Sequence, residues 1–259
     1  MSQVRKYMLG AVAAAAMSMT SMTSQAAITQ LGFILDSSGS IGATNWNTIR
    51  TGLSAALSII PQDGTYEVSV VNFSSSAVVV ANKVLVTAAT IGGLQTAVSN
   101  ATFLNGVTNY AAAFNTMSTT LFGGAIPGRT YDFQYVNFAT DGEPCCDANS
   151  QTLGTQARNA IVAAGVDNIS IEGIGVNAST KAYLTGTICH PLPCDETQPF
   201  NFPTNGFYIG LTNADAYAAA ISAKIRVITG VPEPTTVALV GLALAGLGLA
   251  RRRKEAKAA

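Results

Sequence analysis

The stretch Phe33-Ile34-Leu35-Asp36-Ser37-Ser38-Gly39-Ser40 (FILDSSGS) decides how this chain is interpreted. An apolar run that begins at Ile28 stops at an aspartate, and three serines and a glycine follow. A short apolar run bounded by turn residues predicts a buried strand. The polar residues after it either form an ordinary turn into a helix or supply oxygen ligands for a metal ion.

Strand patterns and helix patterns alternate downstream of this stretch. Short apolar or Val-rich runs predict strands at 28–35, 66–73, 77–86, 131–139, 169–176 and 207–211. Apolar residues at helical spacing predict helices at 46–60, 91–98, 110–121, 153–164 and 217–228, with Thr44, Asn109 and Asn213 as N-caps for three of them. Residues 186–206 are rich in proline and are predicted to form a loop.

This alternation predicts an α/β fold with a doubly wound, mostly parallel sheet and helices on both faces. The segments 66–73 and 77–86 are separated by three serines, so they predict a hairpin that adds one antiparallel edge strand. Ligands of such sheets bind beyond the carboxyl ends of the strands. The residues that follow each strand are therefore where a site is expected.

Three junctions between strands and helices carry oxygen ligands: Asp36-x-Ser38-x-Ser40, Gly106-Val107-Thr108-Asn109 and Thr140-Asp141-Gly142. Carboxylates and hydroxyls are hard donors, which favour Mg²⁺, Mn²⁺ or Ca²⁺ over zinc or copper. The predicted metal ligands are Asp36, Ser38, Ser40, Thr108 and Asp141. Only two of these carry negative charge, so the bound ion would still attract an acidic group.

Each junction also has a simpler interpretation. Asp36 and its serines could cap the following helix, Asp141-Gly142 could be a plain turn, and Thr108-Asn109 could be an N-cap. Three such coincidences at one edge of the sheet are less expected than a single shared site.

Together FILDSSGS, GVTN and FATDGEP resemble a von Willebrand factor A domain with a complete metal-ion-dependent adhesion site. The resemblance covers about residues 28–229 and implies the Rossmann-like fold of that family. It implies that Ser38, Ser40 and Thr108 bind the ion through their hydroxyls, and that Asp36 and Asp141 hold it directly or through water. A carboxylate of the ligand would complete the metal shell. The chain departs from the family pattern at Tyr110, at Cys145-Cys146 and in the long 186–206 loop. A small residue is expected near the rim at the position of Tyr110. Tyr110 and Tyr183 are interpreted as packing residues, and an aromatic rim for sugar rings is the alternative.

The four cysteines are Cys145, Cys146, Cys189 and Cys194. In an exported domain they are expected to form disulfides, and four cysteines allow three pairings. A Cys189–Cys194 bridge would leave a vicinal Cys145–Cys146 bridge, whereas cross-links between the two loops would avoid that strain. A zinc site with His190 is a further alternative, although the usual paired C-x-x-C spacing is missing.

Both ends of the chain carry targeting features. Residues 1–26 have a basic start, an apolar run and small residues at Ser24 and Ala26, which predict a secretory signal peptide that is cleaved after Ala26. At the other end, Pro232-Glu233-Pro234, an apolar run over 237–250 and a basic cluster resemble a PEP-CTERM sorting signal within residues 231–259. That resemblance implies an exosortase-type processing enzyme and the surface or extracellular matrix of a Gram-negative bacterium. The apolar run predicts a marginal transmembrane helix that anchors the chain transiently in the inner membrane. A plain C-terminal anchor is the alternative to a sorting signal.

Residues 27–230 remain as the exported domain, with seven basic and twelve acidic side chains and a net charge of −5. Nucleic acid is not an expected partner, because phosphate binding needs clustered basic residues. An enzyme is not expected either, since only Glu143 and Asp147 lie near the predicted metal as general bases. The predicted function is binding of an acidic group on a protein or polysaccharide. The alternative is a structural surface or matrix component whose metal site is vestigial or purely stabilising.

Overall fold

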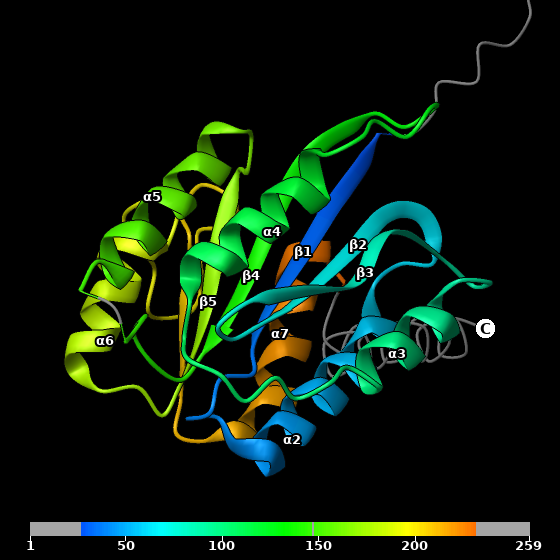
Figure 1. Ribbon diagram of the computed structural model, residues 1–259. Coiled ribbons are helices and arrows are strands. Elements are labelled where there is room, and N and C mark those ends of the chain that lie inside the picture. Colours follow the sequence, from blue (N-terminus) through cyan, green and yellow to red (C-terminus); the bar gives the residue numbers. More distant parts are fainter. Residues whose placement is uncertain (1–26, 147, 232–259) are drawn as a thin grey trace, which may run out of the picture.

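The computed structural model describes residues 27–146 and 148–231. Strands and helices alternate along most of this part of the chain (Figure 1). In chain order the elements are β1 (Ile28–Asp36), α2 (Gly42–Ala56), η2 (Leu57–Ile59), β2 (Asp63–Phe73), β3 (Ala77–Thr87), α3 (Ile91–Ser99), α4 (Tyr110–Phe122), β4 (Tyr131–Thr140), α5 (Ser150–Ala163), β5 (Asn168–Ile174), α6 (Ala178–Tyr183), η3 (Leu184–Ile188), β6 (Tyr208–Leu211), η4 (Ala214–Ala216) and α7 (Tyr217–Thr229).

The six strands form one sheet in the order β3-β2-β1-β4-β5-β6. All neighbouring strands are parallel except β2 and β3, which form the antiparallel hairpin at one edge. The predicted doubly wound α/β fold with one antiparallel edge strand is therefore confirmed. The strand order reverses between β1 and β4, which is where sheets of this kind bind their ligands. Leu35 of β1 pairs with Ala139 of β4, so Asp36 and Thr140 follow side by side at this reversal point.

Helices cover both faces of the sheet, as Figure 1 shows. Successive side chains of a strand point to opposite faces. Phe33 and Leu35 of β1 therefore pack with the buried residues of α2, α3 and α7, while Ile34 packs with those of α4 and α5. Gly32 also faces α4, and a Cβ at this position would lie 2.8 Å from the sulfur of Met117. This contact explains why the central strand carries a glycine there.

Some helix starts differ from the prediction. Helix α2 begins at Gly42 after Ile41, and no side chain caps it, so Thr44 lies inside its first turn. Asn213 caps the short turn η4 by accepting from Asp215 N, and α7 begins only after that turn. Asn109 caps α4 as predicted, because its side chain accepts from Ala112 N.

Helix α6 and the π-helical turn η3 were not predicted, and η3 runs into the region assigned to the 186–206 loop. Helix α6 has only six residues, which is too few for an apolar periodicity to emerge. The available signal was Asn177, whose side chain accepts from Thr180 N at 2.9 Å and caps the helix.

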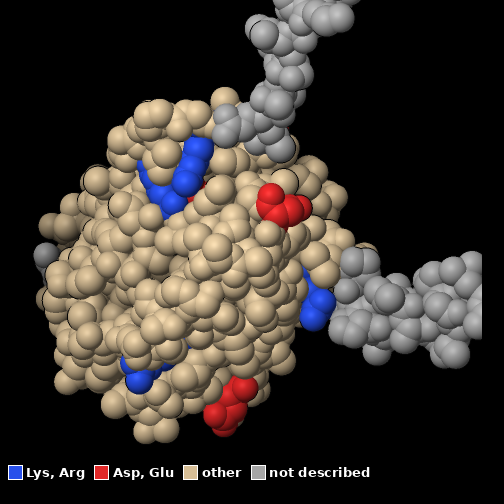
Figure 2. All heavy atoms as spheres, turned by 90° about the vertical axis from the view of Figure 1, so that its right-hand side faces the viewer, with Lys and Arg blue, Asp and Glu red and all other residues tan. Residues whose placement is uncertain are grey.

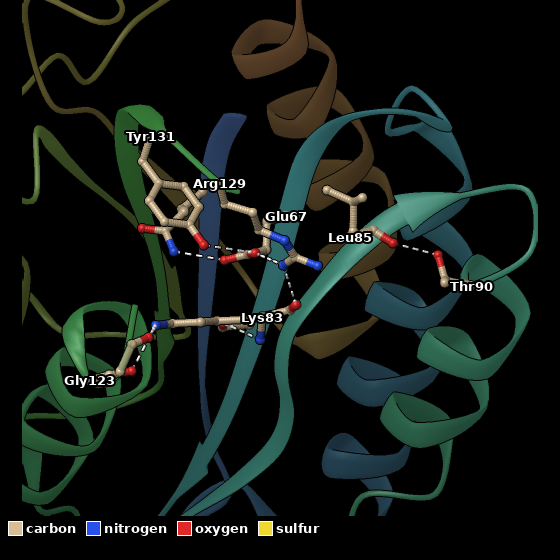
Figure 3. Close-up of polar contacts among 10 residues, drawn as sticks. Glu67, Lys83, Leu85, Thr90, Gly123, Arg129 and Tyr131 are labelled. Atoms are coloured by element: carbon tan, nitrogen blue, oxygen red, sulfur yellow. Dashed lines mark hydrogen bonds and ion pairs between the residues drawn. The ribbon is translucent and has the colours of Figure 1, made fainter. Parts of the chain in front are cut away.

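A polar network ties the hairpin to the loop before β4 (Figure 3). The Glu67 carboxylate is buried and accepts from Arg129, from Tyr131 Oη at 3.1 Å and from Gln30 Nε2 at 2.8 Å. Lys83 Nζ donates to the carbonyls that follow α4, Gly123 O and Gly124 O, both at 2.8 Å. These contacts hold the hairpin at the end of the sheet opposite to the carboxyl end of β1.

The predicted transmembrane helix has to be corrected. Within residues 27–146 and 148–231, no helix is long and apolar enough to cross a membrane. The apolar run at 237–250 that prompted the prediction lies outside these residues, as do the signal peptide at 1–26 and the motif Pro232-Glu233-Pro234.

Candidate metal centre

Asp36 is the last residue of β1, and its carboxylate is buried at the carboxyl end of the sheet. Ser38 N donates to Oδ1 at 2.8 Å and Thr140 Oγ1 donates to Oδ2 at 2.7 Å. Burial raises the pKa of Asp36 to about 6, although these hydrogen bonds act in the opposite direction. The carboxylate is thus fixed in orientation, and a positive charge beside it would offset the cost of its burial.

A chain of hydroxyl contacts leads from this loop to the loop after β4. Ser38 Oγ lies 3.0 Å from Ser40 Oγ, and Ser40 Oγ donates to Asp141 Oδ1 at 2.9 Å. Ser40 is exposed, so this row of oxygen atoms opens to solvent. Burial raises the pKa of Asp141 as well, with Ser40 acting against that shift. The structure therefore brings four of the five predicted ligands into one contiguous group.

Thr108 lies in the loop that precedes α4, and backbone hydrogen bonds place that loop against the Asp36 loop. Gly39 N donates to Gly106 O at 2.8 Å, and Asn105 N donates to Ser37 O at 3.0 Å. Thr108 is itself buried, and its carbonyl accepts from Cys145 N at 3.1 Å. The three predicted junctions thus meet at one edge of the sheet.

The serines between β2 and β3 also support this site, although the sequence analysis predicted only a hairpin turn for them. Ser75 Oγ accepts from Val107 N at 3.0 Å, and Ser74 O accepts from Asn109 N at 3.1 Å. These bonds fix the loop on both sides of Thr108. Serines that follow a strand at the same sheet edge were the only available signal.

Gly106→Ala is expected to disturb this loop. A Cβ at this position would lie 2.3 Å from Ser75 Oγ and 3.0 Å from Ser75 N, so the backbone would have to move. We expect divalent-cation affinity to fall about 10- to 100-fold, as for supporting residues of other metal sites. Calorimetric titration measures the affinity, and Gly92→Ala, where a Cβ meets nothing within 4 Å, is the matched control.

Thr140 and Tyr110 have roles that the sequence did not reveal. Thr140 Oγ1 holds Asp36, and Tyr110 Oη donates to Thr140 Oγ1 at 3.3 Å and also to Gly142 O. Tyr110 is fully buried against Phe73, Phe114 and Phe138. An aromatic rim formed by Tyr110 is therefore wrong, because this ring supports the site from below.

The cysteines form two bridges, Cys145–Cys146 and Cys189–Cys194. The vicinal bridge is exposed and lies beside the loops that carry Thr108 and Asp141. Cys189, in contrast, is buried in the core on the α4 and α5 side of the sheet. The zinc alternative with His190 fails, because Cys189 and Cys194 are bonded to each other. Across the described residues, no group of three His, Cys, Asp or Glu side chains could hold a metal ion.

Glu143, one of the two general bases considered, is engaged in structural contacts. Its Oε1 accepts from Ser179 Oγ at 3.2 Å and from Thr180 Oγ1 at 3.1 Å, at the first turn of α6. Its other oxygen accepts from Gln151 Nε2. Asp147, the second candidate, lies outside the described residues.

Charged side chains are sparse on the face shown in Figure 2. Its Lys and Arg side chains are few and form no broad patch, and Asp and Glu side chains occur among them. A phosphate-binding surface needs basic residues gathered together. The described residues on this face do not form such a cluster.

Solved structures with the same fold include adhesive and matrix proteins. Proximal thread matrix protein 1 from the mussel byssus, described with a zinc-occupied MIDAS motif, is 15% identical, with a TM-score of 0.57 over 78% of this chain and 48% of that one. The pilus adhesin SpaC from Lactobacillus rhamnosus GG is 14% identical, with a TM-score of 0.58 over 78% and 31%. The PilB minor pilin from Streptococcus sanguinis is 17% identical, with a TM-score of 0.57 over 80% and 62%. The chain thus spans less than two thirds of each of these proteins.

A search of curated protein sequences gives no match. Two family models do match the sequence. The PEP-CTERM protein-sorting motif matches residues 230–254, so the chain carries that motif. The model of the von Willebrand factor type A domain matches residues 30–204, which include all five predicted oxygen ligands and most of the six-stranded sheet. The chain belongs to the von Willebrand factor type A domain family.

Proposed function

We propose that this chain is an exported, surface-associated binding protein that holds a divalent cation with Asp36, Ser38, Ser40, Thr108 and Asp141. The observation that carries the proposal is the continuous row of contacts from Asp36 through Ser38 and Ser40 to Asp141. These residues come from two loops on either side of the point where the strand order reverses. The ligand is an acidic group on a protein or an extracellular polysaccharide.

The oxygen spacing fits a small octahedral ion. Neighbouring ligands at the Mg²⁺–oxygen distance of about 2.1 Å lie about 3 Å apart when the bonds are perpendicular. The Ser38 and Ser40 hydroxyls are 3.0 Å apart, and Ser40 Oγ is 2.9 Å from Asp141 Oδ1. Hydrogen bonds have the same length, so a cation can replace these contacts without large movements of the side chains.

The donor chemistry favours Mg²⁺, with Mn²⁺ and Ca²⁺ as alternatives, because every donor is a carboxylate or a hydroxyl. The mussel structure is described with zinc at its MIDAS motif, so Zn²⁺ belongs in any comparison of metals. The cation supplies positive charge for an acidic ligand. The two carboxylates of Asp36 and Asp141 balance the formal charge of the cation, but the cation can still bind an additional acidic group. Ser40 is exposed, so a ligand can reach the cation from solvent.

The sorting motif and the neighbouring folds support a location at the cell surface or in the extracellular matrix. A PEP-CTERM motif directs the chain to an exosortase-type processing enzyme of a Gram-negative bacterium, and removal of residues 1–26 as a signal peptide would precede it. The exported domain would then comprise residues 27–230. An adhesin, a pilin and a thread matrix protein share its fold, which supports binding rather than catalysis.

A structural matrix role is the second candidate, and the likeness to a thread matrix protein favours it. In that role the cation only stabilises the loops, and no ligand completes its shell.

One binding experiment separates the two functions. The wild-type chain is applied to immobilised acidic polysaccharides and acidic proteins, each beside a neutral counterpart, with Mg²⁺ or with EDTA. If the chain is an adhesin, it should be retained on at least one acidic matrix in Mg²⁺. In EDTA its affinity for that matrix should be at least about 10-fold lower, which corresponds to a loss of about 1.4 kcal/mol of binding free energy. Retention that survives EDTA contradicts the metal mechanism. Mg²⁺-dependent stability without retention on any acidic matrix supports the structural role instead.

A further inference from the structure

A second polar cluster is buried between the sheet and α7, away from the loops that carry Asp36, Thr108 and Asp141. It contains Asn137 of β4, Glu172 of β5 and Lys224 of α7. Lys224 and Glu172 are completely buried, and Asn137 is 3% exposed. Residues paired across neighbouring strands point to the same face. Glu172 pairs with Ala139, which packs on the α7 side, and Asn137 lies two residues before Ala139 on that face.

The contacts in this cluster are close, but they are not good hydrogen bonds. Lys224 Nζ lies 2.7 Å from Glu172 Oε1, yet neither atom has a hydrogen-bond partner with suitable angles. The Asn137 carboxamide lies close enough to the Glu172 carboxylate to lower its pKa, but Asn137 Nδ2 and Oδ1 are also without a well-aligned partner. Buried polar groups in folded proteins are normally satisfied. An unsatisfied group of amine, carboxylate and carboxamide therefore needs an explanation.

The surroundings favour the uncharged forms of the amine and the acid. Lys224 Nζ lies 5.1 Å from the ring centre of buried Phe207, and buried Tyr217 lies nearby on α7. Burial lowers the pKa of Lys224 to about 8, and burial raises the pKa of Glu172. A lysine that is desolvated in this way offers its lone pair as a nucleophile near neutral pH.

We propose that Lys224 and Asn137 form an intramolecular amide bond, with Glu172 as the proton carrier. Lys224 Nζ attacks Cγ of Asn137, and a new C–N bond forms. Glu172, in its acid form, gives its proton to Nδ2, and the carboxylate that results takes a proton from the attacking nitrogen. The Cγ–Nδ2 bond then breaks and ammonia leaves. The atoms balance without an oxidant, a reductant or a cofactor.

Lys224 Nζ lies 2.7 Å from Glu172 Oε1, and Asn137 lies on the same buried face of the sheet as Glu172. Positioning a nucleophile beside its target replaces an encounter in solution, which accelerates reactions strongly. The Glu172 carboxylate contacts Lys224 and lies close to Asn137, so the proton has a short path. The product would join α7 to the β4 strand at the centre of the sheet. A surface protein would thereby gain a covalent link between its last helix and its core.

Tryptic mapping of the purified full-length chain tests this directly. Trypsin cleaves after Arg129, Arg158, Lys181, Lys224 and Arg226 in this region. If the bond forms, cleavage after Lys224 stops, and peptide 130–158 is joined to peptide 182–226 with the mass of one ammonia lost. Lys181 is the internal control, because its exposed contact with Glu196 at 2.6 Å should leave cleavage there complete.

Glu172→Gln is the matched variant, because it keeps the shape of the side chain and removes its ability to accept a proton. We expect its tryptic map to contain peptides 130–158 and 182–224 separately, with no joined species. Complete cleavage after Lys224 in the wild-type chain, with peptide 130–158 at its unmodified mass, would overturn the proposal. A joined species in Glu172→Gln would overturn the role of Glu172. The wild-type result does not depend on whether the variant folds.

Discussion

The Asp36→Asn variant is expected to lose measurable Mg²⁺ binding, a reduction in affinity of at least about 100-fold. Even supporting residues of metal sites cost 10- to 100-fold when they are replaced, and Asp36 carries one of only two negative charges in the group. The asparagine side chain keeps the shape, so Ser38 N can still donate to its oxygen. The loss should therefore come from the charge and not from unfolding.

Thermal unfolding should show the effects of the charge and of the metal separately. In EDTA the variant should be at least as stable as the wild type, because a neutral amide costs less to bury than an ionised carboxylate. With Mg²⁺ at 100 times its dissociation constant, only the wild type should gain about 2.7 kcal/mol. The order of stability should thus be reversed by adding metal.

Asp63→Asn is the matched control for this experiment. Asp63 begins β2 at the other end of the sheet and is exposed, and its carboxylate accepts from Thr65. Calorimetric titrations with Mg²⁺, Mn²⁺ and Zn²⁺ should give wild-type affinities for this variant. Equal binding by wild type and Asp36→Asn would contradict the metal centre, as would the absence of binding by the wild type.

The second large effect is expected at Arg129, whose guanidinium is paired with Glu67 in the network of Figure 3. The Arg129→Met variant should lose about 3 kcal/mol of unfolding free energy, because the Glu67 carboxylate would remain buried without its cation. The side chain of Glu67 is only 1% exposed, so water cannot replace the arginine. Chemical denaturation measures the loss.

Lys181→Met is the control, because Lys181 forms an exposed ion pair with Glu196. These side chains are 43% and 42% exposed, so the loss should stay below about 1 kcal/mol. Adding Glu67→Gln to Arg129→Met should restore part of the stability, since it removes the buried charge. Equal losses for Arg129→Met and Lys181→Met would show that the buried carboxylate is not the cause.

The sequence predicted the fold because its signals are local. Apolar residues repeat every second position in strands and every three to four positions in helices, and backbone geometry sets both periods. The three junctions around Asp36, Thr108 and Asp141 could be placed at one edge because parallel strands end there together. The short helix α6 was missed because six residues do not display a period.

The tertiary structure decided which side chains meet. Thr140 holds Asp36 from a position 104 residues away, and Tyr110 lies under both as a buried ring. The cysteine pairing, the contacts of Glu143 with α6 and the burial of Lys224 against Glu172 were equally absent from the local pattern.

FILDSSGS by itself therefore determined that a buried strand ends in a row of oxygen donors. Only the packed structure decided that those donors touch Asp141 and rest on Thr140 and Tyr110. The physical reason is that the spacing of apolar residues shows only which face of a helix or strand is buried. Contacts between loops depend on helix packing, strand order and side-chain orientation, which no single segment encodes.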